Sequence, residues 1–254
     1  MSSDSFKWPN GQQGAVSLRF DDGMDSHIQK AAPLLERHGL RGTFYICPAG
    51  TDEQWQARAE EWKPVLQAGH EIGNHTISHP IPAALADQSW PGRYENLTLE
   101  QYAADVLAAH ERLESAFGRR EWTFCYPCYQ TWVGQGRRCC SVVPFIAEHF
   151  LAAAAGGEIS KPFNDPRSCD RHMLLSLRAD NLPLADLIRR IEQAVLMGRW
   201  AILTFHGVEE GHLPVSVQLL DELATYLVTN RERIWVAPVA EVAKHIRKTG
   251  RDHQ

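Results

Sequence analysis

Short runs rich in apolar and β-preferring residues alternate along the chain with longer segments of helical composition. We interpret these runs as buried strands. They are residues 15–20 (AVSLRF), 42–47 (GTFYIC), 70–74 (HEIGN), 122–126 (WTFCY), 200–205 (WAILTF) and 233–237 (RIWVA). Polar residues follow at the point where most of these runs end.

Helical segments separate the predicted strands. We expect helices at residues 26–39, 53–69, 99–117, 184–197, 216–229 and 239–248. In the first helix, Ser26 or Asp25 could cap the start and Gly39 the end, whereas Pro33 limits its regularity. The run Thr98-Leu-Glu-Gln is a capping box that predicts the start of the helix reaching Phe117.

Strands that alternate with helices imply βαβ units and a mainly parallel sheet. Six or more such units in one domain favour a closed or nearly closed barrel. We therefore expect a single α/β domain, a distorted (β/α) barrel, over residues 14–246. An N-terminal arm (1–13) and a C-terminal tail (247–254) would flank it. Residues 139–180 fit neither pattern and predict a loop-rich excursion.

Candidate chemistry lies where the predicted strands end. Asp21 and Asp22 follow the first strand, His75 and His79 follow residues 70–74, and His206 follows residues 200–205. Because the carboxyl ends of the strands of a parallel barrel form one rim, these side chains should converge. Each has a plainer alternative: Asp-Asp-Gly suits a turn with an Asx cap, and His206 could be a hydrogen-bonded rim histidine.

The pair His75-x-x-x-His79 is weak on spacing alone, because the chain has 12 histidines. On a helical turn, this spacing would put both imidazoles on one face. One Asp with two His is a set that suits zinc or another divalent transition ion and leaves positions open. A second Asp could then act as a base, and a histidine from another strand as an acid.

Four segments carry a family resemblance: SLRFDDG, GHEIGNHTISHP, TFCYPCYQTW and AILTFHGV. In this order and spacing they resemble the polysaccharide deacetylase family, also called the NodB-homology domain or carbohydrate esterase family 4. The resemblance extends from about residue 14 to 246. It implies a distorted (β/α) barrel of the NodB type. It also implies an enzyme that removes acetyl groups from an N-acetylated or O-acetylated carbohydrate and uses one divalent metal ion. We expect Zn2+, with Co2+, Ni2+ or Mn2+ as alternatives.

The same resemblance implies a role for each rim residue. Asp22, His75 and His79 would hold the metal. Asp21 would be the general base for attack by a metal-activated water, and His206 the general acid that protonates the departing amine. A backbone N–H near Tyr129 would help to hold the oxyanion, and Trp132 could stack on a sugar ring.

The chain departs from the family pattern in two motifs. The family often has Arg-Pro-Pro-Tyr in its third motif, where the Arg orients the base, but residues 125–129 read Cys-Tyr-Pro-Cys-Tyr. In the first motif, Arg19 stands where the family usually has Thr. On a strand of period two, Arg19 and Asp21 point to the same side. We hypothesise that Arg19 supplies the missing charge partner; the alternative is an Arg19 that is solvated or paired elsewhere.

Asp180 is a candidate for the acidic residue with which the family tunes the acid histidine. It precedes the helix expected at residues 184–197, at a plausible distance from His206. Asp180 could equally be an N-terminal residue of that helix.

Composition limits the partners and the location. The net charge is −5 with a pI near 6.2, and the chain has no lysine- or arginine-rich run, which argues against nucleic acid and anionic membrane surfaces. The first residues lack the apolar core of a secretory signal, and the apolar stretch 142–157 is too short to span a bilayer. We therefore expect a cytoplasmic protein with free cysteines. The pair Cys125-x-x-Cys128 has no second pair at zinc-ribbon spacing.

Two other functions compete with the deacetylase. Some relatives of the family act on small cyclic amides or ureides without a metal, but this chain keeps all three candidate ligands. A catalytically impaired carbohydrate-binding homologue is the other alternative. The missing third-motif Arg favours it, and the intact Asp21 and His206 count against it. The sequence does not specify the acetylated substrate.

Overall fold

A computed structural model describes residues 6–85, 92–156 and 163–251, so the ends of the expected arm and tail lie outside the described residues. Its helices are α1 (Ala32–Arg37), α2 (Asp52–Gln67), α3 (Leu99–Phe117), α4 (Val143–His149), α5 (Leu184–Leu196), α6 (Val217–Thr229) and α7 (Val239–Arg251). Its strands are β1 (Gly14–Phe20), β2 (Thr43–Ile46), β3 (Glu71–Asn74), β4 (Thr123–Cys125), β5 (Trp132–Val133), β6 (Cys140–Ser141), β7 (Ala152–Ala154), β8 (Leu177–Arg178), β9 (Trp200–Phe205) and β10 (Ile234–Val236).

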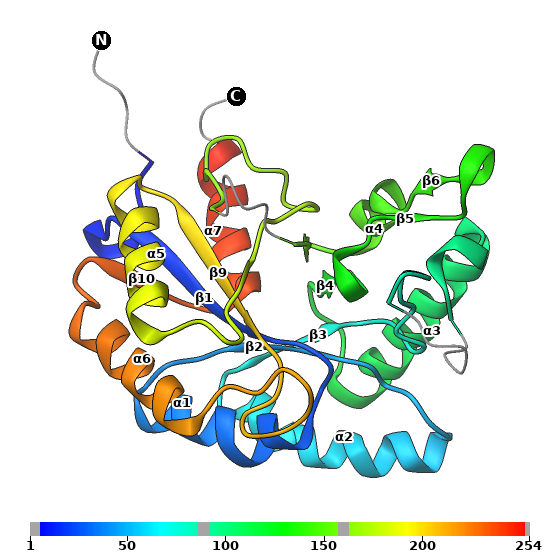
Figure 1. Ribbon diagram of the computed structural model, residues 1–254, viewed down its shortest axis with the longest axis horizontal. Coiled ribbons are helices and arrows are strands. Elements are labelled where there is room, and N and C mark those ends of the chain that lie inside the picture. Colours follow the sequence, from blue (N-terminus) through cyan, green and yellow to red (C-terminus); the bar gives the residue numbers. More distant parts are fainter. Residues whose placement is uncertain (1–5, 86–91, 157–162, 252–254) are drawn as a thin grey trace.

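Eight of these strands form one curved sheet whose ladders are all parallel. The order is β7-β4-β3-β2-β1-β9-β8, and β10 also pairs with β1. Leu174 bridges to Ala154 of β7, and Arg178 of the same segment pairs with Thr204 of β9. This segment therefore joins the two edges of the sheet. The distorted (β/α) barrel predicted from the strand–helix alternation is confirmed (Figure 1).

The alternation of side chains along β1 separates a hydrophobic shell from the barrel interior. Val16, Leu18 and Phe20 belong to the main core, which they share with residues of α1, α5 and α6. The intervening Ser17 and Arg19 are fully buried and point to the other side, into the barrel. Helices α1, α5 and α6 thus cover the outer face of the sheet (Figure 1). The polar side chains of Ser17 and Arg19 lie on its inner face.

Helix α7 forms a second core with the beginnings of the central strands. Its Val239, Val242, Ala243 and Ile246 pack in one buried cluster with residues that include Ala15 of β1 and Trp200 of β9. Parallel strands begin at the edge of the sheet opposite to the one at which they end, so this cluster lies away from Asp21 and His206.

Two predicted elements differ in the structure. Residues 139–180 contain α4, β7 and β8 and are not simply a loop; the β7 sequence is Ala-Ala-Ala, and alanine has little preference for strands. The helix expected at 26–39 begins as a π-helical turn, His27–Ala31, before α1. Ser26 makes no side-chain cap; its Oγ accepts a hydrogen bond from the Val208 N–H instead.

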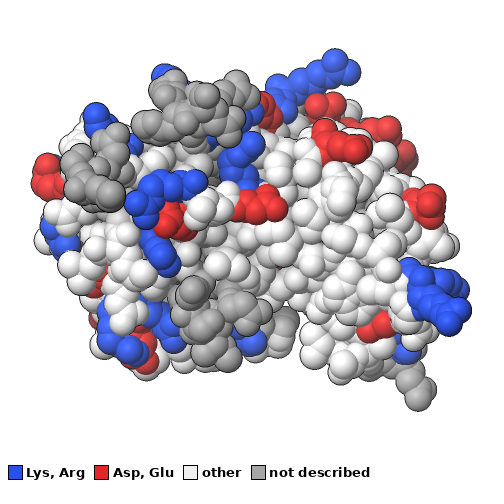
Figure 2. Space-filling view, turned by 90° about the horizontal axis from the view of Figure 1, so that it is seen from above, with Lys and Arg blue, Asp and Glu red and all other residues white. Residues whose placement is uncertain are grey.

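Other expectations concern the cysteines and the surface. All six cysteines are free, as predicted. None of the helices in the described part of the chain is both long and apolar enough to cross a membrane. On the face shown in Figure 2, Lys and Arg are interspersed with Asp and Glu around a broad uncharged area, so charge of one sign does not dominate that face.

Candidate active site and metal centre

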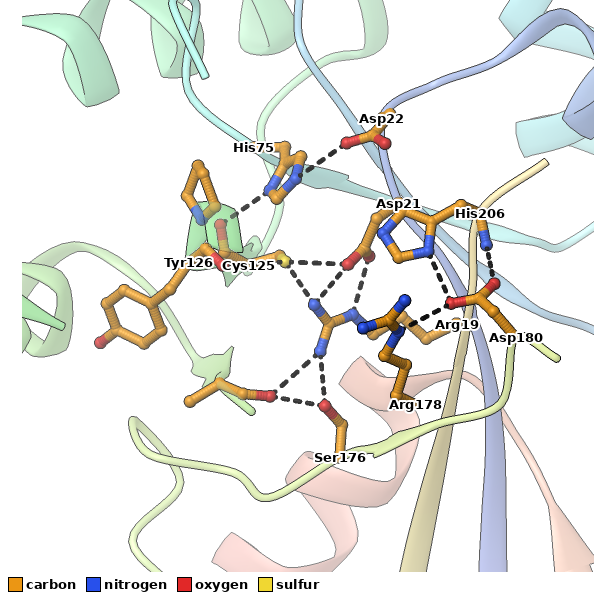
Figure 3. A network of polar contacts seen from close by, with 12 residues as sticks. Arg19, Asp21, Asp22, His75, Cys125, Tyr126, Ser176, Arg178, Asp180 and His206 are labelled. Carbon is orange, nitrogen blue, oxygen red and sulfur yellow. Dashed lines mark hydrogen bonds and ion pairs between the residues drawn. The ribbon is translucent and has the colours of Figure 1, made fainter. Parts of the chain in front are cut away.

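The structure brings the five candidate rim residues together. Asp21 and Asp22 follow β1, His75 follows β3, His79 ends the next turn, and His206 follows β9. These strands are parallel, so their carboxyl ends lie on one edge of the sheet. Figure 3 shows most of this network, with two further arginines and Asp180 beside it.

Asp22, His75 and His79 form a compact group of potential metal ligands. One ligand atom from each lies within 4.8 Å of the others. The Nε2 atoms of His75 and His79 are 3.4 and 3.3 Å from Asp22 Oδ1. His75 Nδ1 is 2.9 Å from the backbone oxygen of Cys125, which fixes the proton on Nδ1 and leaves the Nε2 lone pair for an ion. The donor set therefore fits one divalent transition ion.

The loop between the two histidines is not helical, contrary to the interpretation of the HxxxH spacing. Thr76 and His79 have φ angles of 64° and 45°, in the left-handed region that favours glycine. Asn74 Oδ1 accepts the Thr76 N–H at 2.8 Å, and Thr76 Oγ1 accepts the His79 N–H at 3.0 Å. These bonds hold a strained turn that brings the rings to 4.8 Å between centroids.

The Asp22 carboxyl is ionised within this group. Burial opposes ionisation of Asp22, but hydrogen bonds from His75 and His79 outweigh it and lower the pKa of Asp22. The carboxylate is therefore ionised at neutral pH and available as a ligand.

Arg19 clamps Asp21 inside the barrel. Its Nε and one terminal nitrogen donate to the two carboxylate oxygens of Asp21 at 2.7 and 2.5 Å. Arg19 is fully buried, and its other terminal nitrogen donates to Ser176 Oγ at 3.0 Å and to the Ala155 carbonyl at 3.3 Å. Burial opposes ionisation of Asp21, but the charge and hydrogen bonds of Arg19 lower the pKa of the carboxyl below its usual value. The contact that we hypothesised between Arg19 and Asp21 is present (Figure 3).

A second group of potential ligands is less suitable for a cation. Asp21, His75 and Cys125 also place ligand atoms within 4.8 Å of one another. However, the Arg19 guanidinium contacts both Asp21 and the Cys125 Sγ, the latter at 2.6 Å. A metal ion there would face a buried positive charge at close range. The group with Asp22 and both histidines is the better metal site.

His206 is held by Asp180 on one side and by His27 on the other. Its Nδ1 and its backbone N–H are 3.0 and 3.1 Å from the two oxygens of Asp180. The Nε2 of the buried His27 is 2.8 Å from the His206 carbonyl oxygen. Burial lowers the pKa of His206, but the hydrogen bond to Asp180 and the nearby carboxylates raise it overall. Asp180 thus contacts His206 and precedes α5, whose N-cap is Pro183.

Tyr129 and Trp132 lie beside this network in different ways. The Tyr129 N–H donates to the Tyr126 carbonyl at 2.9 Å, so this amide is not free for an oxyanion. The Tyr129 ring packs against Arg19, with 5.6 Å from the guanidinium carbon to the ring centroid. Its hydroxyl is buried without a hydrogen-bond partner among the described residues. Trp132 lies on β5 and is partly exposed.

The sequence gives no signal for the contacts that three residues of the site make. His27, Cys125 and Ser176 contact His206, Arg19 and Asp21 only because distant segments meet inside the barrel. His27 was one histidine among 12, in an expected helix. Only the tertiary structure assigns these contacts.

Comparison with known proteins supports the family resemblance. A sequence model described as polysaccharide deacetylase matches residues 9–131, which include Asp21, Asp22, His75 and His79. This match supports the resemblance to the polysaccharide deacetylase family. Its fold resembles that of a solved structure from Mycobacterium smegmatis assigned to the polysaccharide deacetylases, with a TM-score of 0.63, 15% identity and coverage of 98% of this chain and 95% of that one. A family 4 acetyl xylan esterase from Clostridium thermocellum, in complex with a cobalt ion, gives a TM-score of 0.55 at 16% identity and coverage of 91% and 90%.

Curated relatives match this chain only in part. The peptidoglycan-N-acetylmuramic acid deacetylase PdaA of Bacillus subtilis is 31% identical over 87 residues, which are 34% of this chain and 32% of that protein. The chain spans between 10% and 36% of the length of the first three curated relatives. These matches support the family and leave the substrate open.

Proposed function

We propose that the protein is a metal-dependent hydrolase that removes acetyl groups from an N-acetylated, or O-acetylated, carbohydrate. One observation carries the proposal: a three-residue metal-ligand set, a clamped carboxylate and a carboxylate-bound histidine converge at the rim of one barrel. Metal ligand, base and acid are the groups that hydrolysis of an amide or ester needs.

Asp22, His75 and His79 would hold one divalent ion. Two imidazoles with one carboxylate favour Zn2+, and Co2+, Ni2+ or Mn2+ are alternatives; a structural neighbour binds cobalt. When bound, the ion would supply Lewis acidity to the acetyl carbonyl and to the attacking water. His75 contributes Nε2 because its Nδ1 proton is engaged by the Cys125 carbonyl.

Asp21 would accept the proton of the attacking water. Arg19 keeps this carboxyl ionised and in one orientation, because it binds both oxygens in a bidentate arrangement. A base whose carboxylate is already charged at neutral pH can accept a proton throughout the physiological range. Arg19 acts here through Asp21, as a positioning residue.

His206 would donate a proton to the leaving nitrogen or oxygen. Asp180 holds Nδ1 and thereby directs Nε2 away from itself, toward the opening of the site. Asp180 also raises the pKa of the imidazole, so that more of it is protonated at neutral pH. Attack of water and protonation of the leaving group together give acetate and a free amine or hydroxyl.

Substrate contacts would come from the third-motif segment. Trp132, partly exposed on β5, would offer an apolar face to a sugar ring. Tyr129 would shape the same side of the site through its ring, since its amide already bonds to Tyr126. Two curated relatives are named as peptidoglycan deacetylases, one for N-acetylmuramic acid and one for N-acetylglucosamine. Peptidoglycan sugars are therefore the first compounds to test.

The test is acetate release by the zinc-loaded protein from chitooligosaccharides, peptidoglycan fragments, acetyl-xylan and free N-acetyl sugars. We expect turnover of at least one of them. Asp21→Asn and His206→Ala should each reduce kcat by about 100-fold or more, the usual contribution of general acid–base catalysis. Turnover that survives His206→Ala would remove His206 as the acid. Release from none of these sugars, with hydrolysis of a small cyclic ureide, would instead favour the amidohydrolase.

A further inference from the structure

Arg178 is the second arginine that the sheet directs into the barrel. In the register of the sheet, Arg19 of β1 pairs with Thr204 of β9, and Thr204 pairs on its other side with Arg178 of β8. Paired residues of neighbouring strands point to the same face of a sheet. Arg178 therefore leaves the backbone toward the interior, like Arg19, and Figure 3 shows it within the polar network.

The two arginines differ in how their charge is compensated. Arg19 is fully buried and binds both oxygens of Asp21. The Arg178 side chain is 55% exposed, and its Nε lies 3.6 Å from Asp180 Oδ2, beyond hydrogen-bond distance. Within the described part of the chain, this ion pair is its one polar contact.

Asp180 is shared between His206 and Arg178. Its side chain is fully buried, and its two oxygens already accept the backbone N–H and the Nδ1–H of His206. Asp21 is likewise neutralised by Arg19. Among the described residues, the two terminal nitrogens of Arg178 therefore have no hydrogen-bond partner, and they lie near the histidine that would meet the leaving group.

We propose that Arg178 binds a carboxylate of the substrate, so that the preferred substrate is an acetylated sugar with a carboxylate on the acetylated residue or on the residue beside it. This inference rests on the proposed deacetylase function. The planar fork of one guanidinium matches one carboxylate in a bidentate pair. A doubly charged phosphate group would be expected to meet more than one cation, and among the described residues Arg178 is the one arginine in an ion pair with Asp180.

The test compares each acid with its own methyl ester. One probe is the methyl glycoside of N-acetylmuramic acid, whose carboxylate is on the acetylated sugar. The other is a disaccharide of N-acetylglucosamine and glucuronic acid, whose carboxylate is on the neighbouring sugar. We expect the zinc-loaded protein to prefer one of the two acids to its ester by about tenfold in kcat/KM, the effect of one hydrogen bond to a charged group. The probe that shows the preference identifies the position of the carboxylate.

Substitutions of Arg178 test whether this residue causes the preference for the acid over its ester. Arg178→Gln should abolish it by raising KM for the acid, with kcat and thermal stability unchanged. Arg178→Lys should keep part of it. Arg137→Gln, which removes an exposed arginine from the segment between β5 and β6, should change neither value. Equal turnover of acids and esters by the wild type, or a preference that persists in Arg178→Gln, would overturn the inference.

Two further outcomes separate this inference from its competitors. If Arg178→Gln lowers kcat for acid and ester alike and moves the alkaline limb of the pH profile, Arg178 acts through Asp180 and His206, and carboxylate recognition is wrong. If the protein turns over none of the probes, calorimetry measures the binding affinity for each acid and its ester. If no probe releases acetate but an acid binds more tightly than its ester, the proposed deacetylase function is wrong and carboxylate recognition is supported. If no probe releases acetate and acid and ester bind equally, both proposals are wrong.

Discussion

Arg19 and Asp21 lie two residues apart on β1, and both side chains point into the barrel. The pair places a positive charge beside the candidate base from the same strand, whereas the family often uses an arginine from its third motif. Cys125, in that motif, contacts the guanidinium through its sulfur. In this chain, the charge partner of the candidate base thus comes from β1.

Removal of this partner should be costly. In Arg19→Gln, Asp21 stays buried without its cation, so its pKa should rise and the acid limb of kcat/KM should move to higher pH. We expect kcat to fall by about 100-fold and the free energy of unfolding to fall by about 3 to 5 kcal/mol, because a buried charge loses its partner. The pH profile and urea denaturation measure these effects. Arg19→Lys should show part of each.

A double variant is the control for this prediction. Arg19→Gln combined with Asp21→Asn removes both charges, so it should be more stable than Arg19→Gln alone. A wild-type pH profile in Arg19→Gln would contradict a role of Arg19 in keeping Asp21 ionised.

Asp180 should control the alkaline limb of the pH profile of kcat. Because its hydrogen bond and charge raise the pKa of His206, the acid stays protonated to higher pH in the wild type. Asp180→Asn should move the alkaline limb of kcat to lower pH and reduce kcat by about tenfold. Asp186→Asn, which loses only an ion pair with Arg189 on α5, should leave the limb in place. An unchanged limb in Asp180→Asn would show that Asp180 does not tune His206.

At the scale of elements, α3 holds the turn that carries the two candidate histidine ligands. Asn74, at the end of β3, donates to the Val106 carbonyl of α3 at 3.1 Å and accepts the Thr76 N–H at 2.8 Å. Asp105 of α3 accepts hydrogen bonds from Ser78 in the same turn. A strained turn between β3 and α3 is therefore fixed at both of its ends.

Asn74→Ala should loosen this turn. The buried Thr76 N–H would lose its acceptor, which costs about 1 to 3 kcal/mol. Metal affinity should fall by about 10- to 100-fold, as for other residues that orient metal ligands. Urea denaturation and competition with a chelator measure the two effects. Asn96→Ala, at an exposed position in the described segment before α3, is the control and should change neither. Wild-type affinity in Asn74→Ala would contradict this role.

Much of this arrangement could be predicted from local pattern. The alternation of side chains along β1 predicts that Arg19 and Asp21 point to the same side of the sheet. The capping box predicts where α3 begins. The strand ends gave the position of the rim residues. The turn after β3 could not be predicted, because HxxxH suits a helix and the positive φ angles of Thr76 and His79 are imposed by Asn74 and α3. Strand β7 was missed because Ala-Ala-Ala gains its pairing only from β4.

At the scale of the whole molecule, one edge of the barrel carries the candidate chemistry and the hydrophobic shell around it carries stability. Buried histidines make the folding stability depend on pH. Burial lowers the pKa of His27 to about 4 and that of His70 to about 4, so both are neutral in the folded protein. The unfolded chain binds their protons below a pH of about 6.5. Folding stability should therefore fall as the pH falls from about 6.5 to about 4.

His27→Gln should reduce this dependence. A pKa that is lowered to about 4 by burial corresponds to about 3 kcal/mol lost across that range, at 1.36 kcal/mol per pKa unit. The measurement is the free energy of unfolding in urea at several pH values. The variant should lose stability less steeply than the wild type, and His149→Gln, at an exposed position, should not. Equal slopes in the wild type and His27→Gln would show that His27 is not the titrating group.

The central claim is that Asp22, His75 and His79 hold the ion on which deacetylation depends. The most direct measurement is acetate release by chelator-treated protein titrated with Zn2+, on the best acetylated sugar found. We expect activity to rise in proportion to added zinc, to level off at about one equivalent, as one three-ligand site requires, and to stay at background in Asp22→Ala. Full activity after chelation, or an equal rise in Asp22→Ala, would contradict the account.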